Sequence, residues 1–213
     1  MARPRFDKLD PEKQDEILGA AAEEFSSNGY EAASMNRIAE RAGSSKGVLY
    51  YYFEDKADLL ATVARRALAR VLEKTEWPPM EALTADDYWE RVREVSRLSL
   101  TWMEAETWYL RLLRAFWRLR EEEAAREATA GVLDWSRDIT RPLLRRGQEL
   151  GVVRTDLPLE LLLEMYLAAD QAGDRWTAEH WDDFDEHGKL QLLEAHMNLA
   201  RDILDARHMG WEP

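Results

Sequence analysis

The sequence predicts an all-α fold. Ala, Leu, Glu and Arg dominate, no stretch alternates apolar and polar residues with a period of two, and apolar residues recur at steps of three and four. At 213 residues and 46% hydrophobic, the chain can bury a core as one domain or as two modest ones. The absence of cysteine excludes a disulfide framework, a thiolate zinc site and a cysteine nucleophile, and it suits a reducing cytosol.

Four helices are expected before residue 74. Pro11 suits a first turn and Gly29 a C-terminal stop, Ser34 is a natural N-cap, and Gly43 can end a short helix. Asp55, with an acid three residues on, caps the next segment. The expected helices cover about 11–28, 34–43, 45–53 and 55–73.

A second region is expected beyond Pro78 and Pro79, which break any helix. Residues 1–74 hold 12 Lys or Arg against 13 Asp or Glu, whereas 75–213 hold 17 against 29 and all nine tryptophans. The apolar periodicity brings the total to about nine helices, and Pro142 should kink or interrupt one of them. The later helices are expected at about 84–104, 106–120, 122–150, 158–176 and 189–207.

Two short helices joined at Gly43 fit a helix-turn-helix, whose second helix enters the DNA major groove. Ala39 is small where the helices would cross, Gly43 can adopt the left-handed turn, and Leu49 can pin the second helix to a core. The spacing therefore indicates a DNA-reading element.

The stretch SMNRIAERAGSSKGVLYYYFEDKADLL, residues 34–60, resembles the signature of TetR-family transcriptional regulators. The likeness covers about residues 11–74, and beyond that only helix count and chain length. It implies a three-helix helix-turn-helix DNA-binding domain at 1–56, a connecting helix at 57–76, and a helical ligand-binding and dimerisation bundle at 77–213. It further implies a homodimeric repressor that a small molecule releases from a near-palindromic operator of double-stranded DNA.

The resemblance also implies which residues contact DNA. Ser34 would cap the second helix and touch phosphate, and Lys56 would grip phosphate at the start of the fourth. Val48 replaces the commoner threonine, so apolar contact with a thymine methyl would replace one hydrogen bond. The implied contacts are Ser34, Asn36, Arg37, Ser45, Lys46, Gly47, Val48, Tyr50, Tyr51, Tyr52 and Lys56.

Helical geometry supports an outward role for the tyrosines without the family. Leu49 and Phe53 lie one turn apart on the inward face, so Tyr50, Tyr51 and Tyr52 cannot all point inward. Their hydroxyls can donate to phosphate oxygens. Pure packing is the alternative for these rings, because aromatic clusters at helical spacing ordinarily form core.

The second region offers candidates for an effector pocket and a dimer interface. Aromatic rings beside carboxylates would suit a lipophilic or cationic ligand. Pocket candidates are Ser99, Trp102, Trp108, Tyr109, Trp117, Trp135, Tyr166 and Asp170. By the family pattern the last two helices pair across the dimer through Leu162, Met165, Ala169, Leu193, Met197, Ala200 and Leu204. Core packing within one subunit is the alternative for both sets.

Catalysis finds little support, because the four late histidines accompany no HExxH, phosphate-loop or nucleophile motif. The stretch HWDDFDEH lacks the glycine and spacing of a calcium loop, so no metal or cofactor is expected. No apolar run approaches the ~18 residues of a spanning helix, which favours a cytoplasmic protein without a membrane partner. The alternative function is a helical ligand-carrying or protein-interaction protein that no longer binds DNA.

Overall fold

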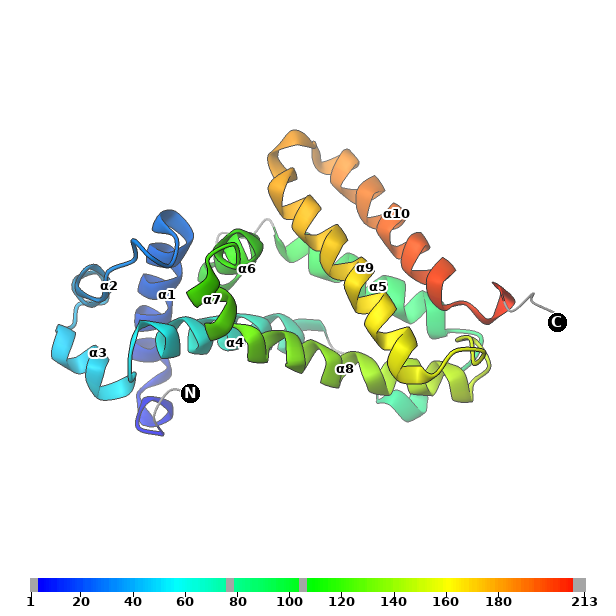
Figure 1. Cartoon of the computed structure of the whole chain (residues 1–213), viewed down its shortest axis with the longest axis horizontal. Coiled ribbons are helices and arrows are strands. Elements are labelled where there is room, and N and C mark those ends of the chain that lie inside the picture. Colours follow the sequence, from blue (N-terminus) through cyan, green and yellow to red (C-terminus); the bar gives the residue numbers. More distant parts are fainter. Residues whose placement is uncertain (1–3, 76–78, 104–106, 209–213) are drawn as a thin grey trace. The chain divides into compact units, whose positions relative to one another are not determined.

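The computed structural model describes residues 4–75, 79–103 and 107–208, with the side chains of 75, 96–103 and 208 outside that description. Within these ranges the chain forms ten α-helices, four short 3-10 helices and no strand beyond one isolated bridge between Val153 and Asp205 (Figure 1). The all-α prediction is confirmed. None of the described helices is long and apolar enough to cross a membrane.

The chain divides into two compact units, and the first contains residues 1–74 and 104–133. Its helices are α1 (Pro11–Asn28), α2 (Met35–Arg41), α3 (Lys46–Tyr52), α4 (Lys56–Thr75), α6 (Trp108–Leu119) and α7 (Glu123–Ala128). The last residue of α4, Thr75, already belongs to the second unit. In this unit α1 packs against both α6 and α2, and α2 packs against α3. The later domain predicted at 77–213 includes residues 107–133. These pack with the helix-turn-helix domain, called the head below, because the apolar side of α6 lies against α1.

The second unit contains residues 75–103 and 134–213. It holds α5 (Tyr88–Met103), most of α8 (Ala130–Glu149), α9 (Leu159–Glu179) and α10 (Glu186–Leu204). Figure 1 shows α9 and α10 side by side, and α10 also packs on α5. The core of this unit gathers Leu83, Tyr88, Leu144, Val153, Leu162, Leu163, Leu167 and Leu204.

Pro142 does not interrupt the helix predicted at about 122–150, which is divided at Thr129 instead. Residue Pro142 lies inside α8, and Thr129 separates α7 from α8. The buried Thr129 hydroxyl donates to the Ala125 carbonyl at 2.7 Å and accepts from Arg120 at 2.6 Å. The Thr129 side chain is therefore anchored at the residue where α7 ends.

Candidate nucleic-acid interface

The helix-turn-helix forms where the sequence predicted it. The Ser34 hydroxyl accepts from the Arg37 amide at 3.5 Å and caps α2, and the Ser45 hydroxyl accepts from the Val48 amide at 3.3 Å and caps α3. Between the two helices Gly43 has a φ of 57°, the left-handed conformation that glycine adopts without strain. Ala39 is buried where the helices meet. Two capped helices are therefore held at a fixed crossing.

The two faces of α3 divide as helical geometry predicted. Leu49 and Phe53 are fully buried, whereas Val48, Tyr50 and Tyr51 are exposed. Ser45, Lys46 and Gly47 are exposed at the start of the helix, as is Asn36 on α2. All of these exposed residues therefore lie outside the packed core and can contact base edges or phosphates, as predicted.

The third tyrosine is partly a packing residue. Tyr52 is half-buried, and its ring lies edge-on to Phe6 at 5.9 Å and to Tyr51 at 5.1 Å between centroids. Phe6 in turn packs on Phe53 at 4.9 Å. The role of Phe6 could not be predicted, because a single aromatic residue ahead of the first helix has no periodicity to place it.

Lys56 has a structural role within the subunit, in addition to its predicted phosphate contact. Its Nζ donates to the carbonyls of Tyr30, Glu31 and Ala33 at 2.6, 3.0 and 3.3 Å, and it lies 4.5 Å from the Tyr30 ring centroid. An ammonium group has three donors, so all of them are used within the head. Lys56 thus fixes the loop between α1 and α2, and its predicted phosphate contact stays a prediction.

Arg37 is held within the head as well. Its Nε donates to Oε1 of Glu24 at 2.8 Å, and its Nη2 donates to the Ala32 carbonyl at 2.7 Å. Glu24 is fully buried and also accepts from the Ser34 amide. Burial alone would raise the pKa of Glu24, but the hydrogen bonds from Arg37 and from that amide lower it by more, so the pKa falls below its ordinary value. Arg37 therefore neutralises a buried carboxylate, and its predicted contact to bases or backbone stays a prediction.

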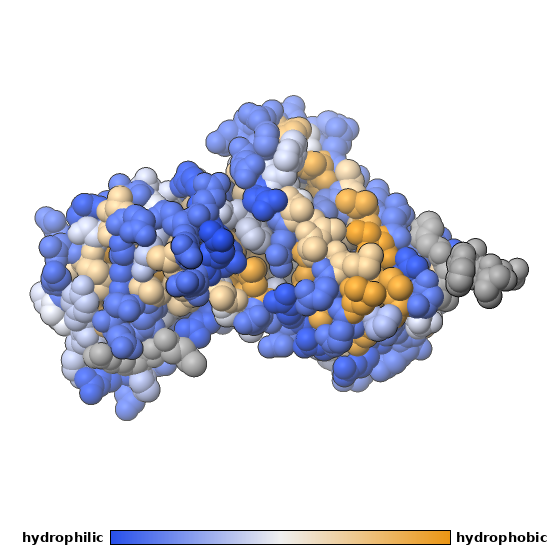
Figure 2. Space-filling view, in the orientation of Figure 1, coloured by the Kyte–Doolittle hydropathy of each residue, from blue (hydrophilic) through white to orange (hydrophobic). Residues whose placement is uncertain are grey.

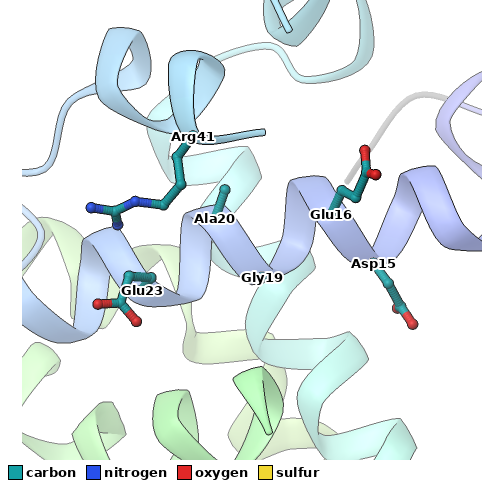
Figure 3. Close-up of a pocket in the computed structure, with 6 residues that line it drawn as sticks. All are labelled: Asp15, Glu16, Gly19, Ala20, Glu23 and Arg41. Atoms are coloured by element: carbon teal, nitrogen blue, oxygen red, sulfur yellow. The ribbon is translucent and has the colours of Figure 1, made fainter. Parts of the chain in front are cut away.

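A groove of about 490 Å³ lies in the head along α1 and is lined by acids (Figure 3). Figure 3 shows Arg41 of α2 reaching over α1 toward Glu23. Asp15 pairs with Arg70 at 3.2 Å, Glu16 pairs with Lys13 at 2.6 Å, and Glu23 pairs with Arg111. Each lining acid has a cationic partner, so the groove is a neutralised part of the fold.

Comparison with known proteins identifies the fold and its family. The family model described as bacterial regulatory proteins, tetR family, matches residues 17–63. The HTH-type transcriptional repressor AcnR of Corynebacterium diphtheriae is 30% identical over 153 residues, which cover 70% of this chain and 73% of AcnR. The chain belongs to the TetR family. It is a DNA-binding transcriptional regulator and not an enzyme, and its partners are operator DNA and a small-molecule effector.

Solved TetR-type structures share this fold. FadR of Bacillus halodurans, described as a fatty acid degradation regulator, superposes with a TM-score of 0.72 at 21% identity, covering 91% of this chain and 96% of its own. FadR of Bacillus subtilis, solved in complex with stearoyl-CoA, gives a TM-score of 0.70 at 19% identity, covering 91% and 98%. The predicted architecture of a helix-turn-helix head followed by a helical bundle is confirmed.

The predicted pocket residues of this TetR-family protein fall in both units. Trp108, Tyr109 and Trp117 lie on α6 in the first, while Trp135, Tyr166 and Asp170 lie in the second. Ser99 and Trp102 lie outside the described side chains. Within the first unit Tyr109 is buried beneath Lys74, whose Nζ lies 5.3 Å from the ring centroid.

The predicted dimer residues also divide. Leu162, Ala200 and Leu204 are buried inside one subunit, so the structure assigns them to the core and corrects their place at an interface. Ala169, Leu193 and Met197 are half-buried, and Met165 is exposed. The exposed apolar side chains on α9 and α10 are Leu161, Met165, Ala168, Ala172, Trp176, Leu190, Ala195 and Leu199.

No group of three or more His, Cys, Asp or Glu side chains is placed to hold a metal ion in the part of the chain that the structure describes.

Proposed function

We propose that this TetR-family regulator is a homodimeric repressor that a small molecule releases from a near-palindromic operator. The observation that carries the proposal is the similarity to AcnR, a protein named as a repressor, over 153 residues. That length exceeds the 74 residues before the first boundary between units, so the match extends beyond the helix-turn-helix.

The functional division follows the chain. We propose that residues 1–56 bind DNA, that 57–76 connect, and that 77–213 bind the effector and pair the subunits. Residues 104–133 of the last region pack within the first unit, so they support the head as well.

The apolar surface of α9 and α10 supports pairing of two subunits. Met165 and Leu199 are 48% and 54% exposed. Figure 2 shows apolar side chains gathered over the part of the surface that these helices form. A soluble chain rarely leaves such a patch uncovered, and a two-fold DNA site needs a two-fold protein. We assign this surface to the dimer.

Light scattering during gel filtration tests the dimer. Met165→Glu combined with Leu199→Glu places four charges in a closed two-fold interface, so we expect a monomer of half the mass. Val48→Glu is the matched control, since it charges an exposed valine on α3 and should leave the dimer intact. A double variant that elutes as a dimer would place the subunit contact elsewhere.

The second unit supports a lipophilic or cationic effector. Tyr166 donates to Asp170 on the same helix, and His196 of α10 lies 3.8 Å from an Asp170 oxygen. Burial raises the pKa of Asp170, and the facing His196 opposes that rise. A bound ligand cation would stabilise the charged form of this partly desolvated carboxylate and would also be attracted to the neighbouring aromatic ring.

The effector's charge is tested with two probes of one chain length, dodecyltrimethylammonium and dodecanoate. The cation should change tryptophan fluorescence saturably and release labelled operator. Asp170→Asn should weaken binding of the cation, whereas the exposed control Asp182→Asn should not. Dodecanoate acting as well or better would overturn the charge assignment.

Selection from random duplexes tests operator binding itself. A near-palindrome should be enriched, and its binding should weaken as salt rises because neutralised phosphates release counterions. If no site is enriched, or if the affinity does not change with salt, the alternative function of a helical ligand-carrying or protein-interaction protein would be favoured.

A further inference from the structure

Residues 4–10, ahead of α1, are fixed to the end of α3. Phe6 is fully buried, and its ring packs on Tyr52 and Phe53. Two hydrogen bonds hold the following turn, from the Leu9 amide to the Phe6 carbonyl at 3.0 Å and from Gln14 to the Leu9 carbonyl at 2.9 Å. The segment therefore has a defined position beside the recognition helix.

This anchor carries Arg5 onto the exposed side of α3. The Arg5 guanidinium carbon lies 4.6 Å from the centroid of the Tyr51 ring, and Tyr51 is 49% exposed. At the other end of the same helix Lys46 lies 5.8 Å from the Tyr50 ring centroid. Two cations thus flank the exposed tyrosines of α3.

Neither cation is neutralised by the fold. No ion pair joins Arg5 or Lys46 to a carboxylate within residues 4–75, 79–103 and 107–208, whereas Arg37 pairs with Glu24. Lys56 spends its donors on carbonyls. The cations available beside α3 are therefore Lys46 on the helix itself and Arg5, which lies outside the helix-turn-helix.

The geometry points to Arg5 as a further DNA-positioning residue, which binds a backbone phosphate next to the site read by α3. A guanidinium over an aromatic ring uses its face for the ring, and its five N–H donors lie in its plane, where they match phosphate oxygens bidentately. The ring also fixes the side chain before DNA arrives, which lowers the ordering cost of binding. This inference rests on the DNA-facing role proposed for α3.

The test measures operator affinity across a range of salt for wild type and Arg5→Gln. We expect about tenfold weaker binding at low salt, and a salt slope shallower by about one for each head and about two for a dimer. The loss should be equal on the operator and on unrelated duplexes, and the melting temperature should not change.

Three further variants separate the possible causes. Arg145→Gln makes the same charge change at an exposed position of α8 and should leave the slope unaltered. Tyr51→Phe keeps the ring and should preserve the Arg5 contribution, while Tyr51→Leu removes the ring and should make a second change at Arg5 less costly.

Several results would overturn the inference. These are an unchanged slope in Arg5→Gln, an equal fall in Arg145→Gln, a changed base preference, or a loss of affinity that follows a lower melting temperature. Wild type that selects no site, or whose binding ignores salt, would instead defeat the proposed function, so the two failures are distinguishable.

Discussion

Replacing Glu122 should loosen the loop that leads into α2. Glu122 stands at the N-cap of α7, yet its two carboxylate oxygens accept from the amides of Tyr30 and Glu31 at 2.7 and 2.6 Å. Lys56 holds the carbonyls of the same loop from another side. The loop before α2 is therefore held by the carboxylate of Glu122 and the ammonium group of Lys56, both of which lie far from this loop in the sequence.

The magnitude follows from the two bonds. A hydrogen bond to a charged group contributes about 1.5–3 kcal/mol net, and Glu122 is half-buried, so Glu122→Ala should lower the free energy of unfolding by about 3 kcal/mol. Glu122→Gln should cost about half as much, because its carbonyl oxygen still accepts one amide while its NH₂ group meets the other donor.

Urea unfolding followed by tryptophan fluorescence measures these losses, and operator affinity should fall in the same order. Glu121→Gln is the matched control, since it makes the same charge change one residue earlier at an exposed position. Equal midpoints for Glu121→Gln and Glu122→Gln would refute the anchoring role.

A double-mutant cycle with Gly29 sharpens the test. Gly29 has a φ of 76°, and a Cβ there would lie 2.6 Å from Oε1 of Glu122, so Gly29→Ala meets both backbone strain and a steric clash. Glu122→Ala removes the clash only. The double variant should therefore be less unstable than the sum of the two single variants, and strict additivity would contradict the contact.

Two other changes have defined outcomes. In Asp205, hydrogen bonds from Arg207 hold the carboxyl pKa well below its ordinary value of 3.8, so its stabilisation is present above that value and is lost as pH falls below it. Asp205→Asn should cost about 1–3 kcal/mol at neutral pH and flatten the acid limb of the unfolding profile, and an unchanged limb would exclude this group as its source. Tyr51→Phe should weaken binding to all duplexes alike if its hydroxyl meets phosphate, whereas an altered base preference in a repeated selection would make Tyr51 a base-reading residue.

The sequence was sufficient for most of the helices, although not for the division between α7 and α8, and it was insufficient for long-range polar partners. The caps at Ser34 and Ser45 and the turn at Gly43 depend on local chemistry, so they could be predicted with the burial of Leu49. The role of Lys56 depends on carbonyls 23 to 26 residues earlier in the chain, which no periodicity reveals. The same applies to Glu122, whose amide partners lie 91 and 92 residues away.

The internal partners of Arg37 and Lys56 change what the salt dependence of operator binding should be. As phosphate contacts they would add two neutralised phosphates per head and four per dimer, which steepens the slope of log affinity against log salt by about 3 to 4. Held by Glu24 and by loop carbonyls, they add none. Arg37→Gln and Lys56→Gln should therefore lower the melting temperature and the affinity while the salt slope stays as in wild type, and Lys46→Gln should reduce the slope by about two for a dimer. A slope that falls in Lys56→Gln as it does in Lys46→Gln would restore the phosphate contact, because a lysine that only braces a loop releases no counterions when DNA binds.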